Sequence, residues 1–209
     1  MIDAISALNR LQEGNSRFVN GLRSVEPIMT HAKREALTAG QEPFAIILGC
    51  SDSRVPAEIV FDQGLGDLFV IRVAGNIVAP SQIGSVEFAA SQFKTRLVVV
   101  MGHSQCGAIH ATIEELKRPS SEQSLNIKSI VDRIRPSVEP FKVTELWNDD
   151  DALVEQAMRA NVRASANQLR HGSTLLENLS NNEGLLIVGA EYSLETGEVR
   201  FFEGLPKKS

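Results

Sequence analysis

Residues 44–54 read FAIILGCSDSR, an apolar run that ends in a short polar motif. Residues 97–106 repeat this arrangement with LVVVMGHSQC. Continuous apolar runs of this length are typical of strands buried on both faces, as in a parallel sheet covered by helices. Functional side chains of such sheets lie beyond the carboxyl ends of the strands. The two stretches therefore predict an α/β fold in which two neighbouring strand ends form one site.

Other segments of the chain support this fold class. Candidate strands are residues 44–49, 68–73, 97–101 and 185–189, and candidate helices are residues 82–93, 108–116 and 151–169. The tail, residues 192–202, contains Thr196-Gly197 between two strand-like pieces, which indicates a terminal hairpin. Residues 5–19 form an amphipathic helical arm ahead of the first strand, and it packs either on its own domain or on a second subunit.

The composition limits the class of protein. The chain has 209 residues, of which 43% are apolar and 22% are charged, and its net charge is -5. These values favour one folded domain over residues 1–209, and the acidic balance argues against a nucleic-acid partner. No run approaches the roughly 18 consecutive apolar residues of a membrane span, and the N-terminus does not resemble a secretion signal. We therefore expect a cytoplasmic protein without a membrane partner that acts on a small molecule.

The polar motifs contain the ligand types of a zinc site. The chain has two cysteines, Cys50 and Cys106, one in each motif, and His103 follows the second apolar run. Two Cys and one His, with Asp52 nearby, match the ligands of a tetrahedral zinc shell. Three protein ligands leave the fourth position for water, which indicates catalysis, whereas Asp52 in that position would close the shell. We expect one zinc ion per chain.

Arg54 gives Asp52 a second possible partner. If the chain stays extended after Cys50, the side chains of Asp52 and Arg54 point to the same side as that of Cys50. Arg54 can then hold the Asp52 carboxylate through two parallel hydrogen bonds and favour the open site. Two thiolates and one imidazole cancel the charge of zinc, so bound water should be less acidic than in a three-histidine site. Activity should therefore rise towards alkaline pH.

Three stretches carry a resemblance to a known family. The motifs CSDSR (residues 50–54) and HSQCG (residues 103–107) resemble the paired signature of the β-class carbonic anhydrases, and the similarity extends through FVIRVAGN (residues 69–76). It covers roughly residues 41–109, and its motifs are specific. The resemblance implies a mainly parallel, four-stranded sheet flanked by helices, with an antiparallel addition near the C-terminus. It also implies a homodimer, which in this family often pairs into a homotetramer; the residues do not decide between the two.

The resemblance further implies an activity and roles for the motif residues. The activity is zinc-dependent, reversible hydration of carbon dioxide to bicarbonate and a proton. Cys50, His103 and Cys106 correspond to the zinc ligands of the family. Asp52 and Arg54 correspond to the catalytic pair that orients a zinc-bound hydroxide.

The resemblance also extends to the substrate pocket, which in this family forms at the dimer interface. The plant-like subtype, with a type I pocket, uses a glutamine, a phenylalanine and a second aromatic residue, which correspond to Gln41, Phe69 and Phe88. With Ala74, the two aromatic residues would hold carbon dioxide while the Gln41 amide donates to a developing charge. A second subtype has a non-catalytic bicarbonate site with a tryptophan. That position carries Ile47 here, so we expect no such site.

Three alternatives remain open from the residues. Hydrolysis of carbonyl sulfide or carbon disulfide would use the same framework. A non-catalytic protein with a structural zinc would keep Asp52 permanently on the metal. Cys50 and Cys106 could also be two buried thiols, or one adventitious disulfide, without any metal.

Overall fold

The structure, a computed structural model, describes residues 2–22, 31–119 and 124–206. Its centre is a five-stranded sheet in the order β2-β1-β3-β4-β5. The strands are β1 (Ala45–Gly49), β2 (Leu68–Arg72), β3 (Leu97–His103), β4 (Leu186–Tyr192) and β5 (Val199–Glu203). The first four are parallel, and β5 pairs antiparallel with β4. The predicted fold class, a mainly parallel sheet with a C-terminal antiparallel strand, is confirmed.

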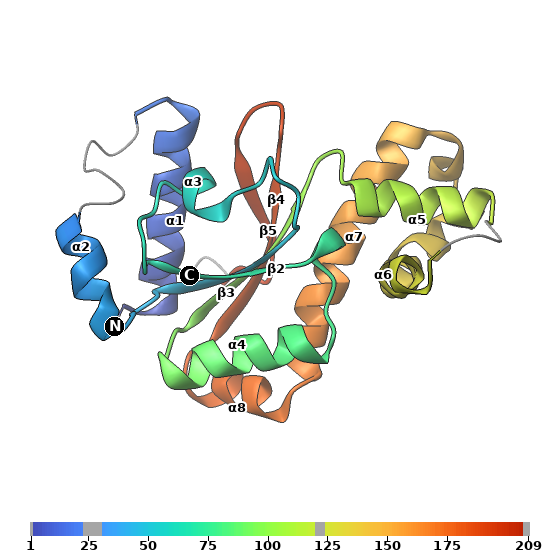
Figure 1. Cartoon of the computed structure of the whole chain (residues 1–209). Coiled ribbons are helices and arrows are strands. Elements are labelled where there is room, and N and C mark those ends of the chain that lie inside the picture. The colour runs from blue at the N-terminus through green and yellow to red at the C-terminus, as the bar shows by residue number, and fades with distance from the viewer. Residues whose placement is uncertain (1, 23–30, 120–123, 207–209) are drawn as a thin grey trace.

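The helices surround the sheet (Figure 1). They are α1 (Ala4–Val19), α2 (His31–Ala36), α3 (Ala57–Val60), α4 (Pro80–Gln92), α5 (Gly107–Lys117), α6 (Leu125–Val138), α7 (Asp150–His171) and α8 (Thr174–Asn182). Short 3-10 helices are η1 (Leu37–Ala39), η2 (Ala74–Asn76), η3 (Glu139–Val143) and η4 (Glu145–Asn148). Helix α6 is absent from the helices predicted from the sequence; its last turn contains Pro136, a residue that usually interrupts a helix. None of the helices in the described ranges is long and apolar enough to cross a membrane.

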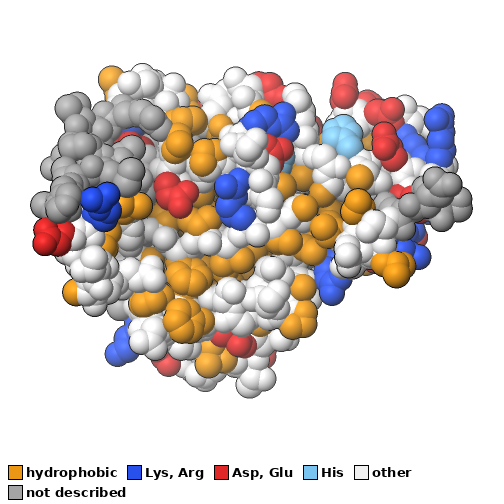
Figure 2. Space-filling model, viewed as in Figure 1, with side chains coloured by type: hydrophobic (Ala, Val, Ile, Leu, Met, Phe, Trp, Pro, Cys, Tyr) orange, Lys and Arg blue, Asp and Glu red, His pale blue; other side chains and the backbone are white. Residues whose placement is uncertain are grey.

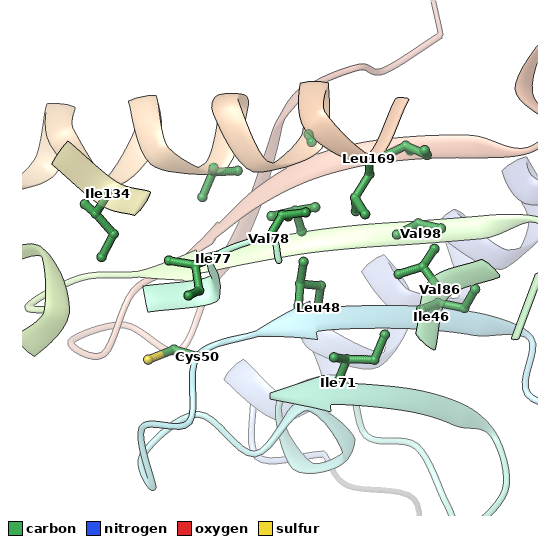
Figure 3. Packing of buried hydrophobic residues seen from close by; sticks show 14 of the residues in the cluster. Ile46, Leu48, Cys50, Ile71, Ile77, Val78, Val86, Val98, Ile134 and Leu169 are labelled. Carbon is green, nitrogen blue, oxygen red and sulfur yellow. The ribbon is translucent and has the colours of Figure 1, made fainter. Parts of the chain in front are cut away.

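The hydrophobic core has one part on each face of the sheet, because successive side chains of a strand point to opposite faces. Ile46 and Leu48 of β1 lie in a cluster with residues of α4, α7 and α8 (Figure 3). Ala45 and Ile47, which alternate with them, pack with residues of α1 and α3. All five residues of β1 are buried. Burial of both faces explains the continuous apolar run that identifies this strand in the sequence.

The N-terminal arm packs on its own chain. Leu8 and Leu11 of α1 are buried in the cluster that covers one face of the sheet. Farther along α1, Asn15 donates to the carbonyl oxygens of Val60 (3.1 Å) and Gly197 (2.9 Å). Its side-chain oxygen accepts the Val199 N–H at 2.8 Å. The arm is therefore tied to α3 and to the hairpin that joins β4 and β5.

Candidate metal centre

Two neighbouring strands bring three possible ligands together. Cys50 follows the last residue of β1, and His103 is the last residue of β3. Cys106 is the N-cap residue of α5, directly before its first turn. β1 and β3 pair in parallel, so their carboxyl ends lie side by side. The ligand atoms of the three buried residues all lie within 4.8 Å of one another.

The orientation of His103 fits metal binding. Its Nδ1 lies 2.8 Å from the Ser104 carbonyl oxygen, to which it donates. The other ring nitrogen, Nε2, is buried and has no hydrogen-bond partner among the described residues. A metal-ligating histidine usually has this arrangement, with one nitrogen fixed by a backbone carbonyl and the other left as the ligand. A buried, unpaired nitrogen beside two sulfur atoms therefore suits a cation such as zinc.

The two thiols are strongly coupled. A hydrogen bond with the Cys106 thiol is the main cause that lowers the pKa of Cys50 to about 4, against the opposing effect of burial. Conversely, the interaction with Cys50, followed by burial, raises the pKa of Cys106 well above its usual range. The pair thus holds one negative charge and resists a second. A cation between the sulfur atoms would remove this restriction, because a coordinating thiol is deprotonated.

Asp52 forms a bidentate pair with Arg54. Arg54 Nε donates to Asp52 Oδ1 at 3.0 Å, and Nη2 donates to Oδ2 at 2.7 Å. The Arg54 backbone N–H adds a third bond to Oδ1 at 2.9 Å. The side-chain bond from Arg54 is the main reason why the pKa of Asp52 lies well below its usual range. Asp52 is therefore ionised at neutral pH, and its Oδ2 lies 3.8 Å from His103 Nε2.

The backbone of this motif differs from the sequence-based expectation. The Val55 N–H donates to the Asp52 carbonyl at 3.0 Å, so the chain turns at Asp52. An extended chain through Arg54, the condition under which the sequence places the two side chains on one side, is therefore not met. The turn also directs the Arg54 backbone N–H to the Asp52 carboxylate, as in an Asx turn. The two side chains still meet, but through a turn instead of a strand.

Arg72 holds the same loop and is absent from the predicted site. From the last position of β2, its Nε donates to the Cys50 carbonyl at 3.0 Å, and its Nη2 donates to the Asp52 carbonyl at 2.5 Å. The basic side chain thus fixes the backbone on both sides of Ser51. Only the family motif around Arg72 could have indicated such a role, since the contact spans 22 positions of the sequence.

The segment η2 lies against the candidate ligands and contains Ala74. The next residue, Gly75, donates its N–H to Cys50 Sγ at 3.4 Å. Gly75 has φ +68°, and a Cβ there would approach Ile134 Cδ1 to 2.7 Å. Helix α7 supports the segment, since Asn161 Nδ2 donates to the Gly75 carbonyl at 2.7 Å. The structure therefore places Ala74 next to the metal-ligand group.

The other predicted pocket residues lie at the opposite end of the sheet. Phe69 pairs with Ile46, four residues before Cys50, which corresponds to about 13 Å along a strand. The ring of Phe88 on α4 lies 6.3 Å from that of Phe69, and the Phe88 side chain is 54% exposed. Gln41 precedes β1 at the same end and is exposed. Within a single chain, Gln41, Phe69 and Phe88 therefore lie away from the metal-ligand group.

Comparisons with known proteins agree with this geometry. Residues 45–199 match the model of a family described as carbonic anhydrase. The chain is 37% identical to carbonic anhydrase 2 of Mycobacterium tuberculosis over 92% of this chain and 90% of the relative. It is 36% identical to a carbonic anhydrase of Mycolicibacterium smegmatis, over 93% of this chain and 91% of the relative.

Solved structures show the same fold. The β-carbonic anhydrase CcaA superposes with a TM-score of 0.70 at 26% identity, over 97% of this chain and 94% of that chain. The β-carbonic anhydrase CafA of Aspergillus fumigatus has a TM-score of 0.74 at 23% identity, over 97% and 91% of the two chains. With its sheet order, its paired motifs and these relatives, the chain belongs to the β-carbonic anhydrase family.

Proposed function

We propose that this protein hydrates carbon dioxide reversibly to bicarbonate and a proton, with one zinc ion held by Cys50, His103 and Cys106. The observation that carries this proposal is the position of the three ligand atoms, within 4.8 Å of one another, beside an ionised and firmly held Asp52. The donor set of two sulfurs and one imidazole nitrogen fits zinc. The likeness to carbonic anhydrases over more than nine-tenths of the chain supports the reaction.

Each polar group at the site then has a task. A zinc ion bound here lowers the pKa of a coordinated water and so supplies a nucleophile at moderate pH. Asp52, ionised and partly exposed, accepts a hydrogen bond and orients the attacking oxygen. Arg54 occupies both Asp52 oxygens and so keeps the carboxylate from becoming a fourth ligand. Arg72 fixes the backbone carbonyls of Cys50 and Asp52.

A second copy of the chain would complete the pocket. Hydrophobic side chains gather along the middle of the face seen in Figure 2, over β2 and α4. Exposed Phe88 of α4 lies beside Phe69 of β2, with 6.3 Å between the ring centroids, and Phe69 is far from the metal-ligand group of its own chain. We therefore propose a homodimer in which Gln41, Phe69 and Phe88 line the pocket of the other subunit, as in the type I subtype. Tetrameric β-carbonic anhydrases of Sordaria macrospora share the fold, and we propose the same pairing of dimers here.

The structure favours this proposal over a closed structural zinc, because Arg54 already binds both oxygens of Asp52. The two cysteines are free thiols, which suits a reducing compartment such as the cytoplasm. No specific feature favours carbonyl sulfide or carbon disulfide as substrate.

Stopped-flow measurement of carbon dioxide hydration by zinc-loaded protein tests the proposal. Turnover should rise from near-neutral pH to about pH 9, because two thiolates leave less positive charge on zinc than three histidines do. Carbonyl sulfide and carbon disulfide serve as parallel substrates. A zinc-loaded protein with no turnover of carbon dioxide at any pH in this range would refute the proposed function.

A further inference from the structure

The turn between β4 and β5 contacts the loop that carries His103 and Cys106. The carboxylate of Glu195, on this turn, accepts hydrogen bonds from that loop with both oxygens. Ser104 Oγ donates to Oε2 at 2.9 Å, and Gln105 Nε2 donates to Oε1 at 2.6 Å. The Leu194 backbone N–H in turn donates to Ser104 Oγ, with 2.9 Å between nitrogen and oxygen. One surface carboxylate is thus bound to both residues that separate the two candidate zinc ligands.

Gln105 has a backbone conformation that needs support. Its φ is +54°, in the left-handed region that a residue with a Cβ adopts at a cost in free energy. This conformation sets the direction of the chain between His103 and Cys106. It also places the Gln105 carbonyl oxygen 3.5 Å from Arg54 Nη2, the nitrogen that binds Asp52. A change in the Gln105 backbone would therefore alter both the position of the ligand Cys106 and the contact with Arg54, which binds Asp52.

We propose that Glu195 is a positioning residue of the metal centre, which acts by holding Ser104 and Gln105 in the backbone conformation that the site requires. The proposal rests on the proposed function for its effect on turnover, but not for its effect on metal binding. The hydrogen bond from Ser104 is the main cause that lowers the pKa of Glu195, which keeps the carboxylate an acceptor at neutral pH.

Backbone hydrogen bonds hold the turn independently of the Glu195 side chain. The Ser193 N–H donates to the Glu198 carbonyl at 2.9 Å, and the Gly197 N–H donates to the Ser193 carbonyl at 2.9 Å. Asn15 of α1 holds the other side of the turn through Gly197 and Val199. A variant without the Glu195 carboxylate should therefore retain the hairpin. It should lose the bonds to Ser104 and Gln105 and one bond within the turn, which Ser193 Oγ donates to Oε2 at 3.0 Å.

Four variants of the full chain test the proposal: Glu195→Ala, Gln105→Gly, the double variant, and Glu198→Ala. Glycine adopts a positive φ without a steric cost, so Gln105→Gly removes the need for support. Glu198→Ala is the matched control, because the Glu198 carboxylate lies on the same turn and has no side-chain partner in the part of the chain that the structure describes. Thermal unfolding verifies that each variant folds. If Glu195→Ala does not, Glu195→Gln, which keeps the size of the side chain, takes its place.

Three measurements are compared across the variants: kcat and KM for carbon dioxide, zinc retained in competition with a chelator, and the visible absorption of the cobalt-substituted protein. Glu195→Ala should lower kcat or zinc affinity roughly 10-fold to 100-fold, with KM unchanged and an altered cobalt spectrum. Glu198→Ala should match the wild type. In the Gln105→Gly background, Glu195→Ala should cause a clearly smaller change, because only the bond from Ser104 to Glu195 is left to lose.

Two results would overturn the proposal. One is a Glu195→Ala variant whose kcat, zinc retention and cobalt spectrum equal those of the wild type. The other is a loss of the same size in the Gln105→Gly background, which would show that Glu195 does not act through Gln105. A wild type that fails to hydrate carbon dioxide would refute the proposed function alone, because zinc retention and the cobalt spectrum still test the role of Glu195.

Discussion

Asp52 and Arg54 form a bidentate ion pair with bonds of 3.0 and 2.7 Å, and the same carboxylate lies 3.8 Å from His103 Nε2. The carboxylate thus lies between a guanidinium and the candidate metal site. Its position allows it to accept a hydrogen bond at the site while Arg54 limits its approach to the metal. This arrangement favours a role for Asp52 as an orienting hydrogen-bond acceptor over a role as a metal ligand.

Asp52→Asn should slow turnover roughly 10-fold to 100-fold while one zinc ion per chain stays bound. The amide keeps the shape of the carboxylate but loses its charge and half of its acceptor capacity. Stopped-flow kinetics and metal analysis of the same preparation measure both effects. Asp150→Asn is a suitable control, because that exposed carboxylate pairs with Lys117, away from the ligands. Loss of zinc from Asp52→Asn alone would contradict the orienting role.

Phe88 should act on the metal centre of a second copy. Cys106→Ser lacks a ligand and Phe88→Ala lacks the aromatic ring, so each variant alone should be nearly inactive. When the two are refolded together, mixed dimers contain one complete site. About a quarter of the wild-type turnover should return, because half of randomly formed dimers are mixed and each has one complete site out of two.

The control for this experiment is a mixture of Cys106→Ser and Cys50→Ser, in which every chain lacks a ligand. That mixture should stay inactive. If the mixture that contains Phe88→Ala is no more active than its two components, Phe88 does not serve a neighbouring subunit.

Gly75→Ala should lower the free energy of unfolding by about 1–3 kcal/mol, as expected for overpacking in a core. The new methyl group would approach Ile134 Cδ1 to 2.7 Å and Ala108 Cβ to 3.0 Å, at a φ of +68°. Urea unfolding at a fixed zinc concentration measures the loss. Ile134→Val removes Cδ1, the carbon atom that the new methyl group meets. Gly75→Ala should therefore cost less stability when it is added to Ile134→Val than when it is added to the wild type. Full stability of Gly75→Ala would show that the segment adapts easily.

The N-cap of α1 should give a pH-dependent contribution to stability. Asp3 accepts from the N–H groups of Ile5 and Ser6, each at 2.9 Å. The backbone bond from Ser6 is the main cause that lowers the pKa of Asp3 from 3.8. A lowered pKa in the folded state means that the charge stabilises the fold above pH 3.8, and that this contribution is lost as pH falls through the folded-state pKa.

Asp3→Asn tests this contribution, because asparagine also caps helices but does not titrate. The melting temperature of the wild type should exceed that of Asp3→Asn at neutral pH, and the difference should vanish in acid. Both proteins are best compared in the Cys106→Ser background, so that release of zinc in acid does not affect the comparison. A difference that is independent of pH would contradict the contribution of the charge.

The sequence predicts the fold class and the metal-ligand group because both depend on local patterns. Apolar runs identify the buried strands, and Cys50 and His103 lie where two of these runs end. The support of these residues could not be predicted in the same way. Arg72 reaches Cys50 across 22 positions, and Glu195 reaches Gln105 across 90. Such contacts depend on which loops the finished sheet places side by side, and no local pattern indicates them.

The backbone after Cys50 shows a different limit. The side-chain pattern brings Asp52 and Arg54 to one side only if the chain is extended, but Asp52 begins a turn through its own carbonyl and carboxylate. Short polar side chains compete for backbone hydrogen bonds in this way, so period-two patterns are unreliable where Ser and Asp follow a strand. The predicted contact between Asp52 and Arg54 is present in the structure for a different reason.

The hairpin that holds the ligand loop has a consequence for the order of events during synthesis. All three candidate ligands have left the ribosome long before Glu195 is made, and Asn15, which holds the far side of the hairpin, is made first. The nascent chain can thus form β1 and β3, with their thiols and imidazole, while the final shape of the loop between His103 and Cys106 still awaits the last strands. If Glu195 positions this loop as proposed, the metal centre takes its final shape only after residues 193–198 have been made.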